Sequence, residues 1–363
     1  HSKLHFIYLM LSKLRLSNFR CFEKIDCLLD NETTIFIGDN AQGKTTILES
    51  VCLLIRLQSP RTSKIRDQVK IGQSNLAVEG LLSDKKVIFS ISGNKRKMQV
   101  QEQTYIKRKD YLKETSLVVW IGNDDILILR GGSNERRRYL DFGASQLNVA
   151  YLTALKAYKR ALRARNFLLK RDASPKWNQI NPYTKLLIDN GNIIAEERRK
   201  LIEQLNKFAS EYQLSVSGDN EELEIIYDRC GGCDLPSAFD EVRNDESKQR
   251  QTLIGPHRDD IVLQINGMDA SKFASEGQQR TIVLALKMAQ SAVLKNATGN
   301  DPLLLIDDIF GELDSSRRNK FLSSLPTGSQ KIITTTNLDW LADFQLGSYK
   351  KYLIENGSIK NSI

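Results

Sequence analysis

The first third of the chain alternates hydrophobic and polar positions, the pattern of β-strands with one buried face. The alternation begins in KLRLSNFRCF, from Lys13 to Phe22, and continues through KIDCLL to the apolar run TTIFIGDN. It returns from Leu76 to Ile106, in NLAVEGLL and KKVIFSISG. We therefore predict a β-rich N-terminal region.

The period changes after the glycine pair Gly131 and Gly132. Residues 134–170 have helical spacing, with arginines and lysines on one face and apolar residues on another. The apolar face contains Leu152, Leu155, Tyr158 and Leu162. We predict a second helix from Tyr183 to Tyr212, broken or bent near Gly191.

Strand character returns in DDIVLQING and is followed by a loop, SEGQQ, that opens onto a helical pattern. The later runs PLLLIDDIF and KIITTT are apolar on both faces, which is typical of buried parallel strands. The pattern predicts a mixed β and α/β body interrupted by a largely helical insert.

Charge is distributed unevenly around a net charge of +9 in 363 residues. From Arg56 to Lys113 there are 14 Lys/Arg against 5 Asp/Glu, and from Tyr151 to Tyr212 there are 13 against 6. The segment from Ser217 to Arg250 is acidic, with 4 against 10. A basic surplus favours a polyanionic partner, nucleic acid before a membrane. The alternative is that these charges only cover solvated faces.

The five cysteines have no disulfide-like spacing, which fits a reducing compartment. We interpret CGGC, from Cys230 to Cys233, as a glycine turn, because a zinc site would need a second ligand pair. The apolar run Phe6 to Leu11 is too short for a signal-peptide core or a membrane span, and Met10 is a possible natural start. We expect a soluble, cytoplasmic protein with no membrane partner.

The stretch GDNAQGKTT fits the phosphate-loop pattern G-x-x-x-x-G-K-[ST] between a strand and a helix. Its glycines let backbone amides wrap around phosphate. Lys44 would reach the β- and γ-phosphates of ATP, and the Thr45 hydroxyl would ligate Mg²⁺. The alternative is an ordinary glycine-rich turn. The candidate nucleotide-binding residues are Gly38, Asp39, Asn40, Ala41, Gln42, Gly43, Lys44, Thr45 and Thr46.

The run PLLLIDDIFGELD supplies the acids that such a loop needs. Asp307 ends the predicted strand, where it would hold Mg²⁺, and Asp308 would orient or deprotonate the attacking water. Lys44 and Asp307 are 263 residues apart, whereas compact phosphate-loop folds close within roughly one or two hundred. A large module therefore lies inside the nucleotide-binding fold.

The loop SEGQQ combines a hydroxyl, a glycine and amides at a helix start. Ser275 and Gly277 offer a hydroxyl and close backbone approach at the positive end of a helix dipole, which suits a phosphate. The alternative is an N-cap serine, which leaves Gly277 and Gln278 unexplained.

The order of phosphate loop, SEGQQ and the Asp-Asp strand resembles ABC-type ATPase heads, and the chain as a whole resembles the RecF family of bacterial DNA replication and repair ATPases. The resemblance is carried by LSNFRCF, GDNAQGKTTILES, GGSNERRRYLD, YKRALRARNFLLK, LIGPHRDD, SEGQQRTIVLALKMAQ, LLLIDDIFGELD and ITTTN. It implies an α/β fold, an ABC-type P-loop ATPase head with a β-rich lobe and an inserted helical arm domain. It places the N-terminal lobe with Walker A at residues 10–145, the arm at 146–250 and the C-terminal lobe with Walker B at 251–363.

The resemblance also implies an ATP-dependent homodimer with weak, DNA-stimulated ATP hydrolysis, in which each signature loop caps the γ-phosphate held by the other head. It implies binding of double-stranded DNA near single-strand gaps, with RecR and RecO as partners in loading RecA recombinase. Two alternatives from other classes are a transport-type ATPase subunit and a nuclease built on the same head.

Individual roles follow from the same resemblance. Ser275, Gly277 and Gln278 form the signature, and Asp314 falls on the D-loop at the dimer interface. Thr335 or Thr336 takes the place of the switch histidine of transporter heads. Asn18 and Arg20 match a loop that approaches the nucleotide. WIGNDD departs from the Pro-Glu-Asp pattern of the family and leaves the Q-loop contact open, and GELD replaces the commoner Ser-Glu-Leu-Asp.

Two basic groups have open interpretations. His257 and Arg258 either contact nucleotide, DNA or a partner lobe, or form a polar turn before a strand. The triple arginine 136–138 either contacts DNA or phosphate or pairs with acids, since cations at a helix start oppose the dipole.

Overall fold

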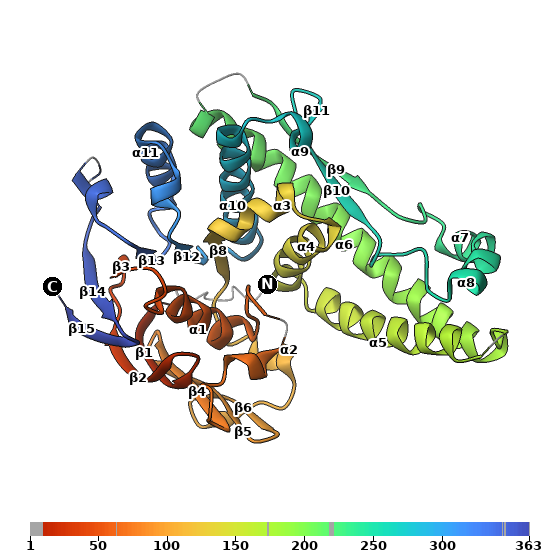
Figure 1. The fold of residues 1–363 in the computed structure, drawn as a ribbon, viewed down its shortest axis with the longest axis horizontal. Helices are drawn as coiled ribbons and strands as arrows, with labels where there is room; N and C mark the ends of the chain where they lie inside the picture. Colours follow the sequence, from red (N-terminus) through yellow and green to blue (C-terminus); the bar gives the residue numbers. More distant parts are fainter. Residues whose placement is uncertain are drawn as a thin grey trace, which may run out of the picture. The chain divides into compact units, whose positions relative to one another are not determined.

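The strands predicted in the N-terminal region lie in one antiparallel sheet, except the run TTIFI, which belongs to a second sheet, in a computed structural model (Figure 1). The structure describes residues 10–62, 64–172, 174–217, 221–342, 344 and 346–362. Residues 1–9, which precede the possible start Met10 and hold most of the apolar run Phe6 to Leu11, lie outside the described residues. The chain forms two compact units. The first extends to Asp125 and resumes from Gln290, with residues 215–217, and the second holds most of the segment between them.

The first sheet of unit 1 is antiparallel, with strand order β2-β1-β4-β5-β6-β7. Its strands are β1 Leu11–Phe19, β2 Phe22–Leu28, β4 Asn75–Leu82, β5 Lys85–Ser92, β6 Lys95–Val100 and β7 Gln103–Thr104. Leu14 and Leu16 on β1 pair with Cys27 and Ile25 on β2, and all four are buried. The alternating pattern therefore places one face of this sheet in the core, as predicted.

The second sheet of unit 1 is mostly parallel, with strand order β15-β14-β3-β13-β12-β8. Its strands are β3 Thr33–Ile37, β8 Val118–Gly122, β12 Leu303–Asp307, β13 Lys331–Thr335, β14 Tyr349–Glu355 and β15 Ser358–Ser362. Strand β13 pairs in parallel with both β3 and β12, so the prediction of buried parallel strands for the two later apolar runs is confirmed.

Helix α1 packs against both sheets of unit 1, which explains why nearly every one of its residues is buried. The helices of this unit are α1 Lys44–Arg56, α2 Arg108–Tyr111 and α11 Ser315–Ser324, with short 3-10 turns at Ile65–Gln68, Asn123–Ile126, Phe310–Glu312 and Asp339–Ala342. α1 follows directly on the phosphate loop, so burial of the helix fixes the position of the loop.

Unit 2 is largely helical, with a small antiparallel sheet of order β11-β10-β9. Its elements are α3 Leu127–Arg130, α4 Ser133–Leu147, α5 Val149–Arg171, α6 Trp177–Ser217, β9 Leu223–Asp228, α7 Leu235–Glu241, α8 Arg243–Gln249, β10 Asp260–Ile265, β11 Met268–Asp269, α9 Ala270–Phe273 and α10 Glu276–Thr298. The last residues of α6 and α10 belong to unit 1.

Two helix predictions need correction. The helical run 134–170 is two helices, because Asn148 is extended at φ −136° and its side chain accepts a hydrogen bond from the amide of Ala150. The expected break near Gly191 is wrong, since α6 continues through it. A Cβ at Gly191 would lie 3.1 Å from Leu235 and 3.4 Å from Tyr158, so the glycine permits close packing on the helix rather than ending it.

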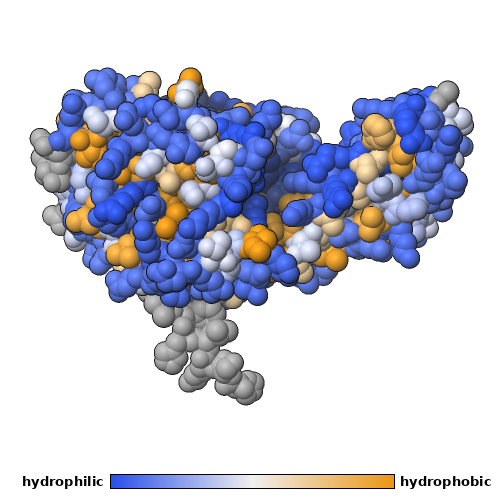
Figure 2. All heavy atoms as spheres, turned by 90° about the horizontal axis from the view of Figure 1, so that it is seen from below, coloured by the Kyte–Doolittle hydropathy of each residue, from blue (hydrophilic) through white to orange (hydrophobic). Residues whose placement is uncertain are grey.

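No helix among the described residues is long and apolar enough to cross a bilayer. On the face drawn in Figure 2, hydrophilic side chains cover most of the surface, and hydrophobic ones lie among them. The two units divide the chain at other residues than the predicted segments 10–145, 146–250 and 251–363, and that functional division remains a prediction.

Candidate nucleotide site

The parallel sheet brings three predicted motifs to one edge. Strands β3, β13 and β12 are adjacent and point the same way, so Gly38, Thr336 and Asp308 each follow a neighbouring strand end. The carboxyl ends of parallel strands are where open α/β sheets bind ligands.

The phosphate loop has a backbone that only certain residues tolerate. Gly43 has φ +104°, and a Cβ there would lie 2.7 Å from the ring of Phe22. A Cβ on Gly38 would collide with the carbonyl oxygen of Ile354. Ala41 also has a positive φ, 64°. Gly43 is therefore required by its backbone conformation and by the space around it, and Gly38 by the space around it.

Lys44 is buried and held by its own loop. Its Nζ donates hydrogen bonds to the carbonyl oxygens of Gly38, at 2.6 Å, and Asp39, at 2.9 Å. Burial lowers the pKa of Lys44, and the nearby carboxylates of Asp308, Asp307 and Asp39 oppose that shift. The ammonium group is thus held at the mouth of the loop, where an anion could accept its third hydrogen bond.

Thr45 and Asp307 meet as the motif pair predicts. The Thr45 hydroxyl donates to Oδ1 of Asp307 at 2.8 Å, and the Thr334 hydroxyl donates to the same oxygen at 2.7 Å. Burial raises the pKa of Asp307, against these two hydrogen bonds. A hydroxyl and a carboxylate oxygen in contact are the donor set that Mg²⁺ prefers, so the residues fit this ion.

Asp308 has a left-handed backbone, with φ 51°, and its amide donates to the carbonyl of Thr334 at 3.1 Å. The side-chain amide of Asn123 donates to the carbonyl of Asp308 at 3.1 Å. Asn123 follows β8, which lies beside β12, and belongs to the segment WIGNDD, for which the Q-loop contact stays open. Sequence reasoning missed Asn123, although an apolar run ending in a polar residue was a usable signal.

Other loop residues divide between anchoring and exposure. Oε1 of Gln42 accepts a hydrogen bond from the amide of Asn356 at 2.6 Å, which holds the loop to the β14–β15 turn. Thr46 is buried, whereas Asp39 and Asn40 are exposed. Gln42 therefore has a structural partner, and its predicted contact with nucleotide remains a prediction.

Arg20 lies on the turn between β1 and β2, and Asn18 lies one residue before the end of β1; both have a positive φ. The guanidinium of Arg20 donates to both carboxylate oxygens of Glu49, at 2.5 and 2.7 Å. Burial raises the pKa of Glu49, but hydrogen bonds from Arg20 and two further side chains bring it below its usual value. Asn18 donates to the side chain of Asn75 at 3.0 Å. Arg20 thus fixes this turn to α1, and a nucleotide contact by either residue is still a prediction.

The signature loop is a capping box in unit 2. The amide of Ser275 donates to Oε1 of Gln278 at 2.8 Å, and the amide of Gln278 donates to Oγ of Ser275 at 3.3 Å. The N-cap interpretation therefore explains Gln278 as well as Ser275, contrary to our expectation. Because Oγ of Ser275 acts as an acceptor here, its own proton is available to a ligand. Gly277 occupies the first turn of α10.

Gln278 is also fixed from its other end. Its Nε2 donates to Glu221 at 2.8 Å, and the second oxygen of Glu221 accepts from Nε2 of Gln213 on α6 at 2.7 Å. Glu221 is buried. The signature glutamine is therefore connected through one carboxylate to the C-terminal part of the long helix.

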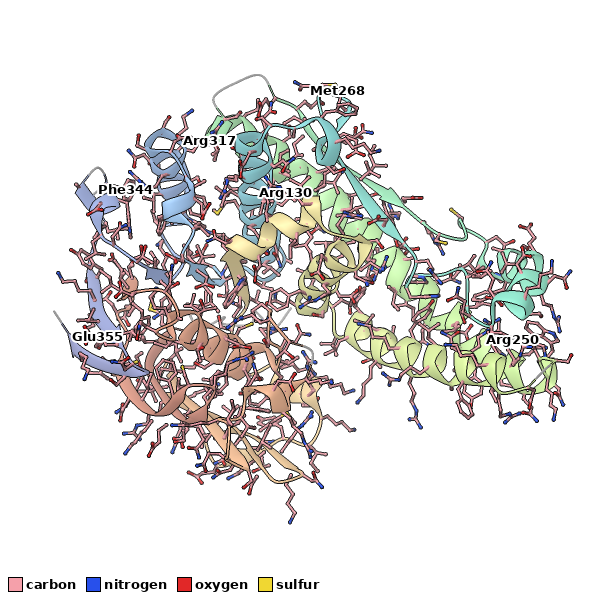
Figure 3. The ribbon with its side chains drawn as sticks, viewed as in Figure 1. Arg130, Arg250, Met268, Arg317, Phe344 and Glu355 are labelled. Atoms are coloured by element: carbon pink, nitrogen blue, oxygen red, sulfur yellow. The ribbon has the colours of Figure 1, made fainter. Side chains whose placement is uncertain are left out.

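A second contact holds the start of α10 to α3, which carries the Arg130 labelled in Figure 3. Arg130 donates to Oε1 of Gln279 at 2.6 Å and lies 3.5 Å from the carboxylate of Glu276. Gln279 in turn donates to the carbonyl of Ala274 at 3.0 Å. Arg130 was not among the predicted site residues, because nothing in the sequence links α3 to the loop.

The predicted D-loop and switch residues take different local roles. Asp314 is the N-cap of α11 and accepts from the amide of Arg317 at 2.9 Å, which contributes to a lowered pKa. Thr335 is buried, and its hydroxyl donates to the carbonyl of Asn337. Thr336 is only partly buried, and its hydroxyl makes no hydrogen bond within the described part of the chain. Between the two threonines, Thr336 has the hydroxyl available to a ligand.

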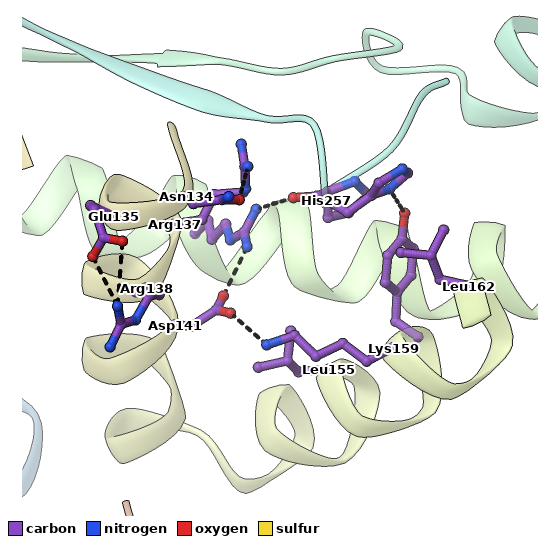
Figure 4. A pocket seen from close by; sticks show the side chains of 12 residues that line it. Asn134, Glu135, Arg137, Arg138, Asp141, Leu155, Lys159, Leu162 and His257 are labelled. Carbon is purple, nitrogen blue, oxygen red and sulfur yellow. Dashed lines mark hydrogen bonds and ion pairs between the residues drawn. The ribbon is translucent and has the colours of Figure 1, made fainter. Parts of the chain in front are cut away.

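His257 lies in a pocket of about 360 Å³ in unit 2 (Figure 4). Its Nδ1 is 2.7 Å from the hydroxyl of Tyr158, and its Nε2 is 3.2 Å from the carbonyl of Thr252. Burial lowers the pKa of His257 to about 4. Both ring nitrogens have partners inside the unit, which favours the structural interpretation for His257, whereas Arg258 is exposed.

The triple arginine is mostly engaged within unit 2. Arg136 makes a two-pronged ion pair with Asp260, at 2.6 and 2.8 Å. Arg137 donates to the carbonyl of Asp259 at 2.7 Å, and Arg138 pairs with a glutamate one turn earlier on α4. Pairing with acids and carbonyls thus accounts for Arg136 and Arg137 without DNA.

Comparison with known proteins decides the family. A family model described as AAA ATPase domain matches residues 10–230. The chain is 31% identical to the DNA replication and repair protein RecF of Agathobacter rectalis, over 97% of this chain and 99% of that protein. It is 33% identical to RecF of Acaryochloris marina, over 94% and 97%. The chain belongs to the RecF family.

Solved structures agree with membership of the RecF family. The structure of the recombination mediator protein RecF with ATP superposes with a TM-score of 0.88 at 29% identity, covering 100% of both chains. An Smc head domain from Pyrococcus furiosus superposes with a TM-score of 0.55 at 16% identity, over 98% and 96%, and shares the fold alone. The fold is that of an ABC-type ATPase head, and membership places the chain among DNA replication and repair proteins with an ATPase domain.

Proposed function

We propose that the chain is an ATP-switched DNA-binding protein of replication and repair, acting in the cytoplasm. The observation that carries the proposal is the direct contact between Thr45 and Asp307 beside a phosphate loop with Lys44 at its mouth. A solved RecF relative is described with ATP, which supports the same nucleotide here. Lys44 would hold the β- and γ-phosphates, and Thr45 and Asp307 would hold Mg²⁺.

Hydrolysis rests on residues at the same sheet edge. Mg²⁺, when bound, neutralises developing charge on the phosphates. Asp308 orients or deprotonates the attacking water, and its backbone is fixed by Thr334 and Asn123. Thr336 has only a hydroxyl at the place of the switch histidine of transporter heads, and a hydroxyl is a weaker base than an imidazole. We therefore infer weak hydrolysis that DNA stimulates, as suits a switch.

A second copy of the chain completes the site. The start of α10 is a helix end suited to phosphate. The oxygen of the Ser275 hydroxyl already accepts a hydrogen bond in the capping box, so its proton can be donated to a phosphate. We infer that Ser275, Gly277 and Gln278 of one copy contact the γ-phosphate held by the other, with Asp314 at the interface. ATP would then join two copies, and hydrolysis would separate them.

The nucleic-acid part of the proposal rests on charge and on the relatives. The net charge of +9 favours a polyanion, and phosphate contacts would dominate affinity. A solved relative is described as a recombination mediator in the RecFOR pathway. We infer that the dimer clamps double-stranded DNA beside single-strand gaps and works with RecR and RecO to help load RecA recombinase.

Light scattering with and without ATP tests the switch. Lys44→Met should abolish ATP-driven dimerisation, and Ser275→Arg should prevent pairing while leaving nucleotide binding by the monomer intact. Lys109→Met and Ser323→Arg, which make the same changes on exposed residues, are matched controls. If both site variants still dimerise on ATP, the assignment of the two motifs is wrong.

A further inference from the structure

Helix α5 has a strongly one-sided charge. It contains seven cationic residues and no acidic residue between Val149 and Arg171. Its buried residues recur every three or four positions, from Tyr151 to Leu169, and pack inside unit 2. The apolar face is therefore already covered, and the opposite face is exposed.

Three of the seven cations are neutralised by partners. Lys159 pairs with Asp141 at 3.1 Å, Arg171 with Asp172 at 2.9 Å, and the buried Arg165 with Glu246. The other four are exposed, and their side chains make neither an ion pair nor a hydrogen bond within the described residues. These four are Lys156, Arg160, Arg163 and Lys170.

The four cations share their face with one exposed aromatic ring. At 100° per residue, Lys156, Arg160, Arg163, Phe167 and Lys170 fall within about 80° of arc and extend about 21 Å along the axis. Phe167 is 64% exposed, one turn from both Arg163 and Lys170. We call these five residues the α5 face. An exposed phenyl ring flanked by cations costs hydrophobic free energy that a ligand would recover.

The cations and the exposed ring of the α5 face together indicate which class of ligand it fits. A row of unpaired cations fits a phosphate backbone, because phosphates release counterions when Lys and Arg neutralise them. A phenyl ring among them can stack on a base only if that base is unpaired. A membrane-surface helix would need its broad apolar face free, and in α5 that face is buried.

We propose that the α5 face binds single-stranded DNA, with Phe167 stacking on a base and Lys156, Arg160, Arg163 and Lys170 along the phosphates. This deepens the proposed function, on which it rests, by assigning the single strand of a gap to a defined surface of unit 2. Helix α6 offers the contrast, since its exposed Arg199 pairs with Glu196 and Glu203 one turn away on either side.

Fluorescence anisotropy of the full-length protein with ATP, using a labelled oligothymidine and a blunt duplex of equal length, tests the assignment. Phe167→Ala and Phe167→Leu should each weaken single-strand affinity about fivefold or more, while Phe167→Trp retains it. Arg160→Gln with Arg163→Gln should lower the slope of log affinity against log salt by about 1.4. Arg199→Gln is the matched control and should change neither quantity.

Several outcomes would overturn the assignment. Single-strand affinity retained in Phe167→Leu would mean that the ring does not stack on a base. The same conclusion would follow if Phe167→Ala lost binding to a protein partner but kept binding to the oligonucleotide. Duplex binding that persists in the wild type without single-strand binding would reject the α5 face and leave the proposed function standing. A wild-type protein that binds neither DNA in ATP would reject both.

Discussion

Arg165 is the most consequential buried charge of the helical unit. It is 1% exposed and joins α5 to three other segments: Nη2 donates to Glu246 on α8 at 2.6 Å, Nε to Thr184 on α6 at 2.9 Å, and Nη1 to Thr252 at 2.8 Å. Its guanidinium also lies 5.0 Å from the ring of Phe239. We predict that Arg165→Met strongly destabilises unit 2.

The magnitude follows from what the substitution leaves behind. Glu246 is fully buried, and after the change its carboxylate retains, among the residues that the structure describes, only the hydrogen bond from the amide of Leu253, at 3.0 Å. Removing one partner of a buried ion pair costs about 3–5 kcal/mol, because the other charge stays desolvated. Arg165→Met combined with Glu246→Gln removes that charge and should recover at least about 2 kcal/mol of the loss.

Hydrogen exchange of α5 and α8 peptides measures the free energy of opening of this unit alone. Arg199→Met, which removes an exposed paired arginine from α6, should change that free energy little. The reasoning fails if Arg165→Met lowers the free energy of opening no more than Arg199→Met does. It also fails if adding Glu246→Gln to Arg165→Met lowers that free energy further and does not restore part of it.

Three further predictions concern acid stability, the signature and the phosphate loop. Burial lowers the pKa of His257 to about 4, so on acidification the unfolded chain takes up a proton at this residue before the folded chain does. Between pH 7 and pH 4 the wild type should therefore lose about 3 kcal/mol more free energy of unfolding than His257→Gln, and an equal loss in both would contradict this. Glu221→Ala should raise the concentration for half-dimerisation in ATP about tenfold without changing nucleotide binding by the monomer, as sedimentation would show. Gly43→Ala places a Cβ 2.7 Å from Phe22 and should abolish ATP binding in calorimetry, whereas Gly72→Ala, with nothing within 4 Å, should not.

The strand pattern and the motifs were predictable from the sequence because each is local. Period-two alternation predicted β1 and β4 as strands with one buried face, and the apolar runs predicted β12 and β13 as buried parallel strands. The phosphate loop and Asp307 could be paired from the sequence alone, since a strand end and a glycine-rich turn are recognisable by themselves, and their contact through Thr45 follows.

The remainder depends on tertiary contacts that no spacing encodes. Gly191 looked like a helix break, but the surroundings of α6 use it for close packing. The sequence left open whether Arg136 contacts DNA or pairs with an acid, because its partner Asp260 is more than a hundred residues away in sequence. Asn123 and Arg130 each act through a partner on another element of their own unit, Asp308 and Gln279, which no spacing in the sequence links to them.

The carboxylate bridge from Gln213 to the signature restricts how this protein could be recombined with its relatives. A chimera that takes the long helix from another member must also bring the residue matching Glu221, because otherwise Glu221, which accepts from Gln278, would face a foreign residue in place of Gln213. Grafting boundaries placed after Gln278, rather than at the end of α6, should therefore yield hybrids that still pair on nucleotide.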